Sequence, residues 1–97
     1  MKNIAFDKIK LTPDEMGKIT PLLNAEARHA WEMYKSGKYR ELYFRTDHPG
    51  AVMVLECENV EEAKKLTDDL PLVKAGYIEF EFIPVGPFTP FEELFEK

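Results

Sequence analysis

The sequence predicts an α+β fold in which helices cover one face of an antiparallel sheet, and three observations lead to that prediction. Within residues 77–85, the apolar Ile78, Phe80 and Phe82 alternate with Tyr77, Glu79 and Glu81, as in a strand with one buried face. Capping signals mark helix starts near residues 12 and 59. The expected elements run strand, helix, strand, strand, helix, strand within 97 residues, a length that suits a single domain over residues 1–97.

Composition narrows the class of protein. The 44% hydrophobic content indicates a folded globule, and the net charge of −5 argues against a nucleic-acid partner, which needs clustered Lys and Arg. The single Cys57 excludes an internal disulfide and fits a reducing compartment. No apolar run approaches the roughly 20 residues of a membrane span, and the start of the chain shows no signal-peptide pattern. We therefore expect a cytoplasmic protein without a membrane partner.

The first strand is expected over residues 3–9, with Ala5 and Asp7 on one of its faces. Thr12, followed by Pro13 and Glu15, is typical of a helix start. Pro21 interrupts the helical pattern that follows, because proline cannot donate a helical hydrogen bond. We therefore expect a kinked helix, or a short one followed by a main helix from Pro21. The main helix should end near Gly37. Its apolar residues at helical spacing are Leu23, Ala27, Ala30, Trp31 and Tyr34.

Residues 39–46 and 51–57 predict two strands joined by a turn. If Thr46 pairs with Ala51, Phe44 faces Met53, and one face of the hairpin is apolar. The opposite face holds Tyr43, Arg45, Val52, Val54 and Glu56. The third strand is then apolar on both faces, which implies that a second subunit covers the face away from the helices.

The second half begins with Asn59 and Glu62, a capping pair before a helix that Pro71 should end. The fourth strand over residues 77–85 follows. Thr89 to Glu92 is a further capping pattern and predicts a short C-terminal helix. Its apolar residues, which should dock on this domain or on a neighbour, are Phe91, Leu94 and Phe95.

This order of elements is the ferredoxin-like βαββαβ arrangement, with both helices on one face of the sheet. Two such sheets packed face to face make a dimeric α+β barrel. The expected partner is therefore a second copy of the chain, as a homodimer or a higher homo-oligomer.

Several segments resemble muconolactone isomerase and its relatives in the dimeric α+β-barrel superfamily, which includes the YCII-like proteins. The matching segments are Ser-Gly-Lys-Tyr at 36–39, Leu-Tyr-Phe-Arg at 42–45, the strand at 52–55, Leu-Pro-Leu at 70–72 and Ile-Glu-Phe-Glu-Phe-Ile-Pro at 78–84. The resemblance covers about the C-terminal half of the chain. The front of the chain departs from the isomerase pattern in its short first strand and in the helix broken by Pro21. The resemblance implies the barrel fold and an isomerase-like activity.

The first candidate site joins Tyr43 and Arg45 with Glu79 and Glu81, and Asp7 is considered beside them. Alternation places the first four on the face turned toward the second subunit. Arg45 could grip a ligand carboxylate bidentately, with Tyr43 beside it. The alternative is a structural network of ion pairs at a subunit interface.

The second candidate is His29, with Glu26 three residues earlier on the same helical stripe. An imidazole beside a carboxylate can serve as a general base near neutral pH. The alternative is a partly exposed surface histidine. The two histidines and one cysteine show no spacing typical of a metal site, and no phosphate-binding Gly-rich loop appears, so we expect neither metal nor cofactor.

Two functions remain open from the sequence. One is a small isomerase or lyase-type enzyme that moves a proton beside the carbonyl of a small organic acid or lactone. His29, Glu79 or Glu81 would be its base, and Arg45 its anchor. The other is a non-catalytic small-molecule-binding or assembly protein on the same fold, because one fold hosts many functions.

Overall fold

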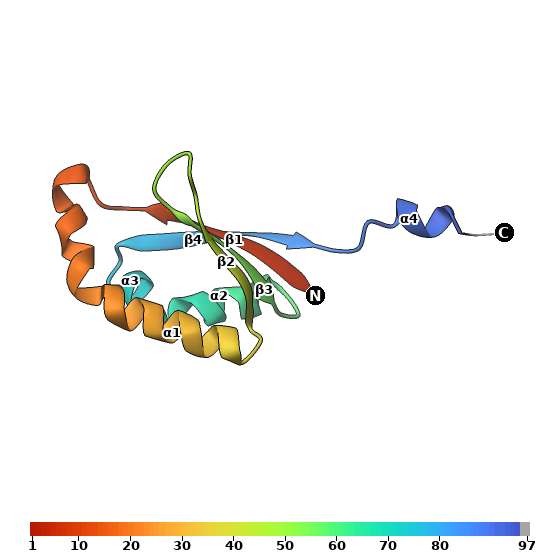
Figure 1. Cartoon of the computed structure of the whole chain (residues 1–97), viewed down its shortest axis with the longest axis horizontal. Helices are drawn as coiled ribbons and strands as arrows, with labels where there is room; N and C mark the ends of the chain where they lie inside the picture. Colours follow the sequence, from red (N-terminus) through yellow and green to blue (C-terminus); the bar gives the residue numbers. More distant parts are fainter. Residues whose placement is uncertain (96–97) are drawn as a thin grey trace.

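The computed structural model describes residues 1–95, and within that range four strands form one antiparallel sheet. The strands are β1 (Lys2–Ile9), β2 (Tyr39–Phe44), β3 (Ala51–Glu56) and β4 (Ile78–Val85), and their order across the sheet is β2-β3-β1-β4. Helices α1, α2 and α3 lie on one side of this sheet (Figure 1). The predicted ferredoxin-like fold is therefore confirmed, with β2 and β4 as the two edge strands.

The helical segments in this range are the 3₁₀ helix η1 (Pro13–Leu22), α1 (Leu23–Lys35), α2 (Val60–Asp68), α3 (Pro71–Lys74) and α4 (Pro90–Glu93). Pro21 lies within η1, and regular α-helix begins only at Leu23, which agrees with a short element followed by a longer one. The chain leaves α1 through Gly37, whose φ of 81° is the expected left-handed conformation. Pro71 follows α2 and also opens α3, because the first helical position tolerates proline.

The core lies between the sheet and the helices. Ala5 of β1 is opposite Met53 of β3 and Phe82 of β4, so these side chains share the helix-covered face. The buried apolar cluster contains Ala5, Tyr39, Met53, Leu55, Cys57, Ala63 and Leu70. In the β2–β3 hairpin, Phe44 pairs with Ala51 rather than with Met53. This two-residue difference from the expected register leaves each side chain on its predicted face, because faces repeat every two residues.

Tyr39 enters the core through an irregularity in the pairing of β2 with β3, between Tyr39 and Glu41. Regular alternation would place Tyr39 on the same face as Glu41 and Tyr43. A bulge turns Tyr39 to the helix side, where it is fully buried and its hydroxyl donates to the Leu66 carbonyl oxygen at 2.6 Å. Burial raises the pKa of Tyr39 above its ordinary value.

The predicted buried stripe of α1 is wrong for Leu23, which is 47% exposed, and for Trp31 and Tyr34, whose side chains are 56% and 49% exposed. Their rings stack with centroids 5.9 Å apart, and Lys35 Nζ lies 5.8 Å from the Trp31 ring centroid. Ala30 and Met33 pack against the core instead. Both sets of residues have helical spacing, so periodicity alone does not separate the buried stripe from the one beside it.

The short C-terminal helix forms as α4, but the Thr89 side chain makes no capping bond within the described residues. Phe91, Leu94 and Phe95 are 63%, 72% and 82% exposed, and the segment extends away from the sheet and the other helices (Figure 1). Docking of this helix on its own domain is therefore wrong. Docking on a neighbouring molecule stays a prediction.

We expect Asn59→Ala to lower the free energy of unfolding by about 1 kcal/mol, because a lost N-cap leaves a backbone donor of the first helical turn unpaired. Asn59 Oδ1 accepts the Glu62 backbone N–H at 2.8 Å at the start of α2. Chemical denaturation followed by circular dichroism measures the change. Asn24→Ala is the matched control, since exposed Asn24 has only a 3.5 Å contact with Arg28 and should stay within about 0.5 kcal/mol of the parent. Equal losses in the two variants would contradict the capping role.

Candidate functional site

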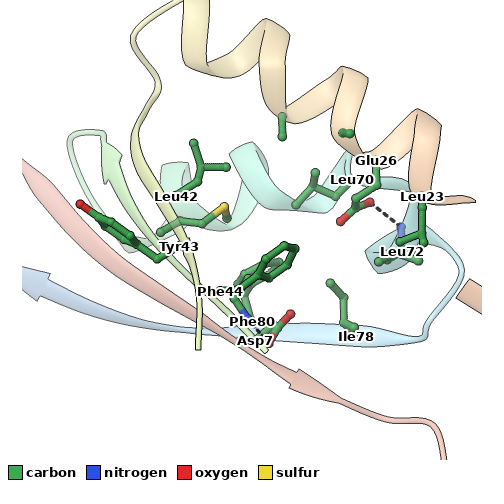
Figure 2. Close-up of a pocket in the computed structure, with 14 residues that line it drawn as sticks. Asp7, Leu23, Glu26, Leu42, Tyr43, Phe44, Leu70, Leu72, Ile78 and Phe80 are labelled. Atoms are coloured by element: carbon green, nitrogen blue, oxygen red, sulfur yellow. Dashed lines mark hydrogen bonds between the residues drawn. The ribbon is translucent and has the colours of Figure 1, made fainter. Parts of the chain in front are cut away.

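An apolar cavity of about 280 Å³ lies between the helix-facing side of the sheet and helices α1 and α3 (Figure 2). Among the described residues that line it, Asp7 and Glu26 are the two with carboxyl groups. The remaining lining residues are Leu23, Ala27, Ala30, Leu42, Tyr43, Phe44, Ala51, Met53, Leu70, Leu72, Ile78 and Phe80. A concave, mostly apolar space with two placed polar groups is typical of a small-molecule site.

Glu26 reaches the cavity from the first turn of α1 and is half-buried. Its Oε1 accepts the backbone N–H of Leu72 at 3.0 Å, as the dashed line in Figure 2 marks. Leu72 is the second residue of α3, and the N–H groups of a first helical turn have no partner within their own helix. The bond therefore satisfies a free donor and fixes the carboxyl group. Burial raises the pKa of Glu26, and the charge of Asp7 raises it further.

Asp7 reaches the same cavity from β1. It is opposite Phe80 of β4 and so lies on the helix-covered face, which corrects its expected place beside Tyr43 and Glu79. Its Oδ1 accepts the Ala51 backbone N–H at 3.0 Å. Burial raises the pKa of Asp7, although this hydrogen bond and the nearby Arg45 charge oppose the rise.

Gly50 allows this approach of Asp7 to the β2–β3 hairpin. A Cβ atom at position 50 would lie 2.9 Å from Asp7 Oδ1, closer than a side-chain atom can be accommodated without movement. Gly50 also has a φ of +154°, which residues with a side chain rarely adopt. The hydrogen bond from Ala51 to Asp7 thus depends on a glycine at the preceding position.

Tyr43, Glu79 and Glu81 share the sheet face that turns away from the helices, as alternation predicted. Tyr43 and Glu81 lie on the two edge strands, three strand spacings or about 14 Å apart. The Tyr43 hydroxyl donates to Glu41 Oε1 at 2.5 Å, a bond that raises the pKa of Tyr43, and Glu79 forms a 3.3 Å ion pair with Lys10. Tyr43 also borders the cavity, although its ring points away from Glu26 (Figure 2).

Arg45 lies one residue beyond the end of β2, in the hairpin loop. Its Nε and Nη2 donate to the two carboxylate oxygens of Asp47 at 2.9 and 2.6 Å. This bidentate pair holds the pKa of the Asp47 carboxyl well below its usual range. The structure therefore places Arg45 one residue beyond the strand in which it was expected, with its guanidinium paired to a carboxylate of the hairpin loop.

His29 lies one turn after Glu26 on α1 but is not among the residues that line the cavity. Its ring packs edge-on against Tyr39 with centroids 6.5 Å apart, and it borders a separate surface groove beside Arg28 and Pro71. His29 Nε2 is buried and has no hydrogen-bond partner within the described residues.

Within one chain, the four residues of the first candidate site are thus not brought together, and His29, the second candidate, lies outside the cavity. The catalytic and ligand-binding roles of these residues stay predictions. Sequence reasoning identified the two carboxyl residues of the cavity, Glu26 and Asp7, only as neighbours of other candidate residues. A detectable signal existed for Glu26, because this acidic residue stands among Leu23, Ala27 and Ala30 on one helical stripe. A carboxylate on an apolar stripe needs either a partner or a function.

Within residues 1–95, no three His, Cys, Asp or Glu side chains gather closely enough to hold a metal ion. The helices of this part of the chain are all too short or too polar to cross a membrane.

Comparison of the chain with protein-family models finds no match, and neither does comparison with curated proteins. Solved structures do match. Muconolactone isomerase superposes with a TM-score of 0.73 and 24% sequence identity, over 90% of this chain and 90% of the isomerase. The 5-chloro-2-hydroxyhydroquinone dehydrochlorinase of Burkholderia phenoliruptrix AC1100, solved with 2,5-dihydroxybenzoquinone, superposes with a TM-score of 0.70 and 14% identity, over 89% and 94% of the two chains. The chain therefore has the fold of muconolactone isomerase, and the resemblance seen in the sequence is confirmed at the level of the fold.

Proposed function

We propose that this protein is a small isomerase or lyase-type enzyme that moves a proton beside a carbonyl group, with Glu26 as the base. The observation that carries the proposal is the Glu26 carboxyl in a cavity that is otherwise apolar except for Asp7. Burial raises the pKa of Glu26, and a carboxylate with a raised pKa is a stronger base at neutral pH than an exposed one.

The reaction needs a base and a group that stabilises the oxygen of the enolate. Glu26 would take the proton from the carbon beside the carbonyl and return it to another carbon of the same molecule, which leaves no net change in protons. Asp7, whose pKa is also raised, would in its protonated form donate a hydrogen bond to the developing oxyanion. In a lyase the electron pair would instead expel a leaving group.

The lining of the cavity favours an uncharged ring compound, such as a lactone or cyclic ketone. Among the described residues that border the cavity there is no lysine or arginine, whereas two carboxyls face it. A negatively charged substrate would be repelled by the Glu26 carboxylate inside the cavity. The organic acid expected from the sequence would have to keep its carboxylate at the mouth, and Arg45 as its anchor would first have to leave Asp47.

The structural neighbours support the same class of reaction. Their names describe an isomerase of a lactone and a dehydrochlorinase solved with a quinone, so both concern small ring compounds. The second candidate function remains a non-catalytic binding protein for such compounds, since the same cavity would serve it. The expected cytoplasmic location of the protein also stays a prediction.

We expect Glu26→Gln to abolish proton exchange while leaving ligand binding nearly unchanged, because glutamine keeps the shape and the acceptor for Leu72 but cannot accept the proton. The probe is a lactone or cyclic ketone selected by thermal-shift screening. Exchange of the hydrogen beside its carbonyl in D₂O, followed by proton NMR, measures the chemistry separately from binding.

Glu79→Gln is the matched control, since Glu79 lies on the other face of the sheet and is paired with Lys10. Loss of exchange in Glu79→Gln but not in Glu26→Gln would contradict the assignment and favour the site predicted from the sequence. Binding of the probe by the parent protein without any exchange would establish the non-catalytic function.

The exchange rate should rise with pH as Glu26 loses its proton and fall again as Asp7 loses its own, because only the Glu26 carboxylate accepts a proton and only protonated Asp7 donates to the oxyanion. Glu26 also gives a signature in stability. Its pKa is raised in the folded protein, so the stability it contributes is fully present below the unfolded pKa and is lost as pH rises through the folded pKa. We therefore expect the parent to lose free energy of unfolding between acid and neutral pH relative to Glu26→Gln, in which this group does not titrate. Parallel pH profiles in urea denaturation would argue against a raised pKa.

We also infer that the working form contains two copies of the chain. The sheet face turned away from the helices carries an apolar patch, here called the outer sheet patch, formed by Ile4, Phe6, Val52, Val54 and Ile83. Ile83 is 49% exposed, the other four are partly exposed, and charged residues of the same face surround the patch. An apolar patch with a polar rim is typical of a protein interface, and a twofold axis can bury the patches of two copies against each other.

Val54→Asp should dissociate this dimer, because an unpaired carboxylate in a packed interface costs several kcal/mol. Sedimentation at micromolar concentration is expected to change from a dimer to a chain of 11.3 kDa. Val60→Asp on α2, outside the outer sheet patch, should leave the dimer intact. A parent protein that sediments as a folded monomer at this concentration would contradict the inference.

A further inference from the structure

A second hollow adjoins the cavity along the edge of the sheet that β4 forms. This hollow, here called the edge groove, has a volume of about 290 Å³ and lies between α2 and β4. Among the described residues, two line both the edge groove and the cavity, and they are Ile78 and Phe80 of β4. These two side chains therefore form the wall between two spaces of nearly equal size.

Phe80 is the larger part of this wall. The alternation of β4 turns Ile78, Phe80 and Phe82 toward the helices, and β4 has a neighbouring strand on one side only. Ile78 is buried at the start of the strand, whereas Phe80 is only partly buried. The ring of Phe80 thus borders open space on both of its sides, and its bulk keeps the two spaces apart.

The wall stands beside one of the two carboxyl groups of the cavity. Phe80 is directly opposite Asp7 in the pairing of β4 with β1, and Figure 2 shows the two side chains next to each other. Residues that face each other across an antiparallel pair have Cβ atoms about 5 Å apart. A substrate whose carbonyl oxygen accepts a hydrogen bond from Asp7 consequently lies beside the Phe80 ring, and a bulky substituent on that side would meet the ring.

The edge groove has a lining that suits an uncharged ring. The rings of Phe80 and Phe82 form part of it, with centroids 6.5 Å apart. Its charged residues form two ion pairs at the rim, Lys10 with Glu79 at 3.3 Å and Lys64 with Asp68 at 2.9 Å. Because each of these charges has a partner of opposite sign, the groove favours neither an anion nor a cation.

The volume of the cavity limits what can bind while the wall is in place. Sites for small molecules usually have volumes of about 300–1,000 Å³. The cavity, with about 280 Å³, lies just below this range and suits a compound with a single ring. The cavity and the edge groove together would lie well within the range and would hold two fused rings.

We propose that Phe80 determines the substrate specificity of this site, because its ring closes the cavity off from the edge groove and limits the substrate to a compound with one ring. The proposal rests on the proposed function, since it concerns the same cavity and specifies the size of the ring compound. Phe80 exchanges no proton in the reaction. It decides which rings reach Glu26, and its replacement by alanine would join the two spaces and admit a second, fused ring beside Asp7.

Two ketones test the size limit, because they share one ring and differ in the other. Cyclohexanone has a single ring, and α-tetralone is the same cyclic ketone with a fused benzene ring. Affinities for both are measured by ligand titration followed by proton NMR. We expect Phe80→Ala to raise the affinity for α-tetralone relative to cyclohexanone by at least about tenfold over the parent, since one added group in an apolar pocket changes selectivity by roughly 10–200-fold.

Phe82→Ala is the matched control. Phe82 is on the same strand and the same face, and it packs against the core as Phe80 does, but it lines the edge groove and not the cavity. Its replacement enlarges the groove without opening the wall, so the ratio of the two affinities should stay that of the parent. Phe80→Leu keeps more of the core packing than Phe80→Ala and should raise the ratio in the same direction to a smaller extent.

Three results would overturn the proposal, with folding of each variant checked by circular dichroism. The first is a ratio that stays unchanged in both Phe80 variants. The second is an equal rise of the ratio in Phe82→Ala, which would trace the effect to a loosened β4 edge rather than to the wall. The third is a parent protein that binds α-tetralone as tightly as Phe80→Ala does.

The binding results are separate from the proton-exchange assay. Selection by ring size without exchange of the hydrogens beside the carbonyl would refute the proposed reaction alone. Exchange in the parent together with an unchanged ratio in the Phe80 variants would refute the role of Phe80 alone. A parent protein that binds neither ketone would refute both.

Discussion

Small side chains between α1 and the sheet are the constraint on which the candidate site depends. Ala27 and Ala30 on α1 and Ala51 on β3 face the space where larger residues would complete the core. On the same face of the sheet, Ala63 of the neighbouring helix α2 is fully buried, so that helix lies close to the sheet. An unfilled space forfeits packing contacts, so the cavity costs stability unless a bound molecule supplies them. The cavity is thus a consequence of the small side chains that α1 and β3 present to each other.

The acidic groups in this cavity are held by backbone N–H groups rather than by basic side chains. Leu72 donates to Glu26, and Ala51 donates to Asp7. A neutral donor satisfies a carboxyl oxygen without supplying a full positive charge, so burial remains the largest influence on both groups and keeps both pKa values raised. An arginine beside either carboxyl would instead form an ion pair and lower its pKa. The pair of Arg45 with Asp47 outside the cavity illustrates that outcome.

The sheet was predictable from the sequence because alternation in residues 77–85 and in the hairpin has one interpretation once one face must be buried. The candidate site was less so. Glu26 and His29 lie on one stripe of α1, and only the position of α3 decides that Glu26 faces the cavity while His29 packs against Tyr39. The partner of Arg45 depended on the hairpin loop, which brings the Asp47 carboxylate within reach of its guanidinium. Residue spacing does not contain either of these tertiary relations.

Gly50 shows how a residue can belong to a binding site without touching what is bound. Its missing side chain leaves the room in which Asp7 reaches the hairpin, and no atom of Gly50 is among those that line the cavity. In a family of related chains, an acidic residue at position 7 should consequently be accompanied by glycine at position 50, whereas loss of the acid removes only one of the two constraints there, because the φ of +154° still favours glycine. A search for relatives that share this chemistry would do better with that pair than with the cavity wall, whose leucines and alanines many unrelated cores also contain.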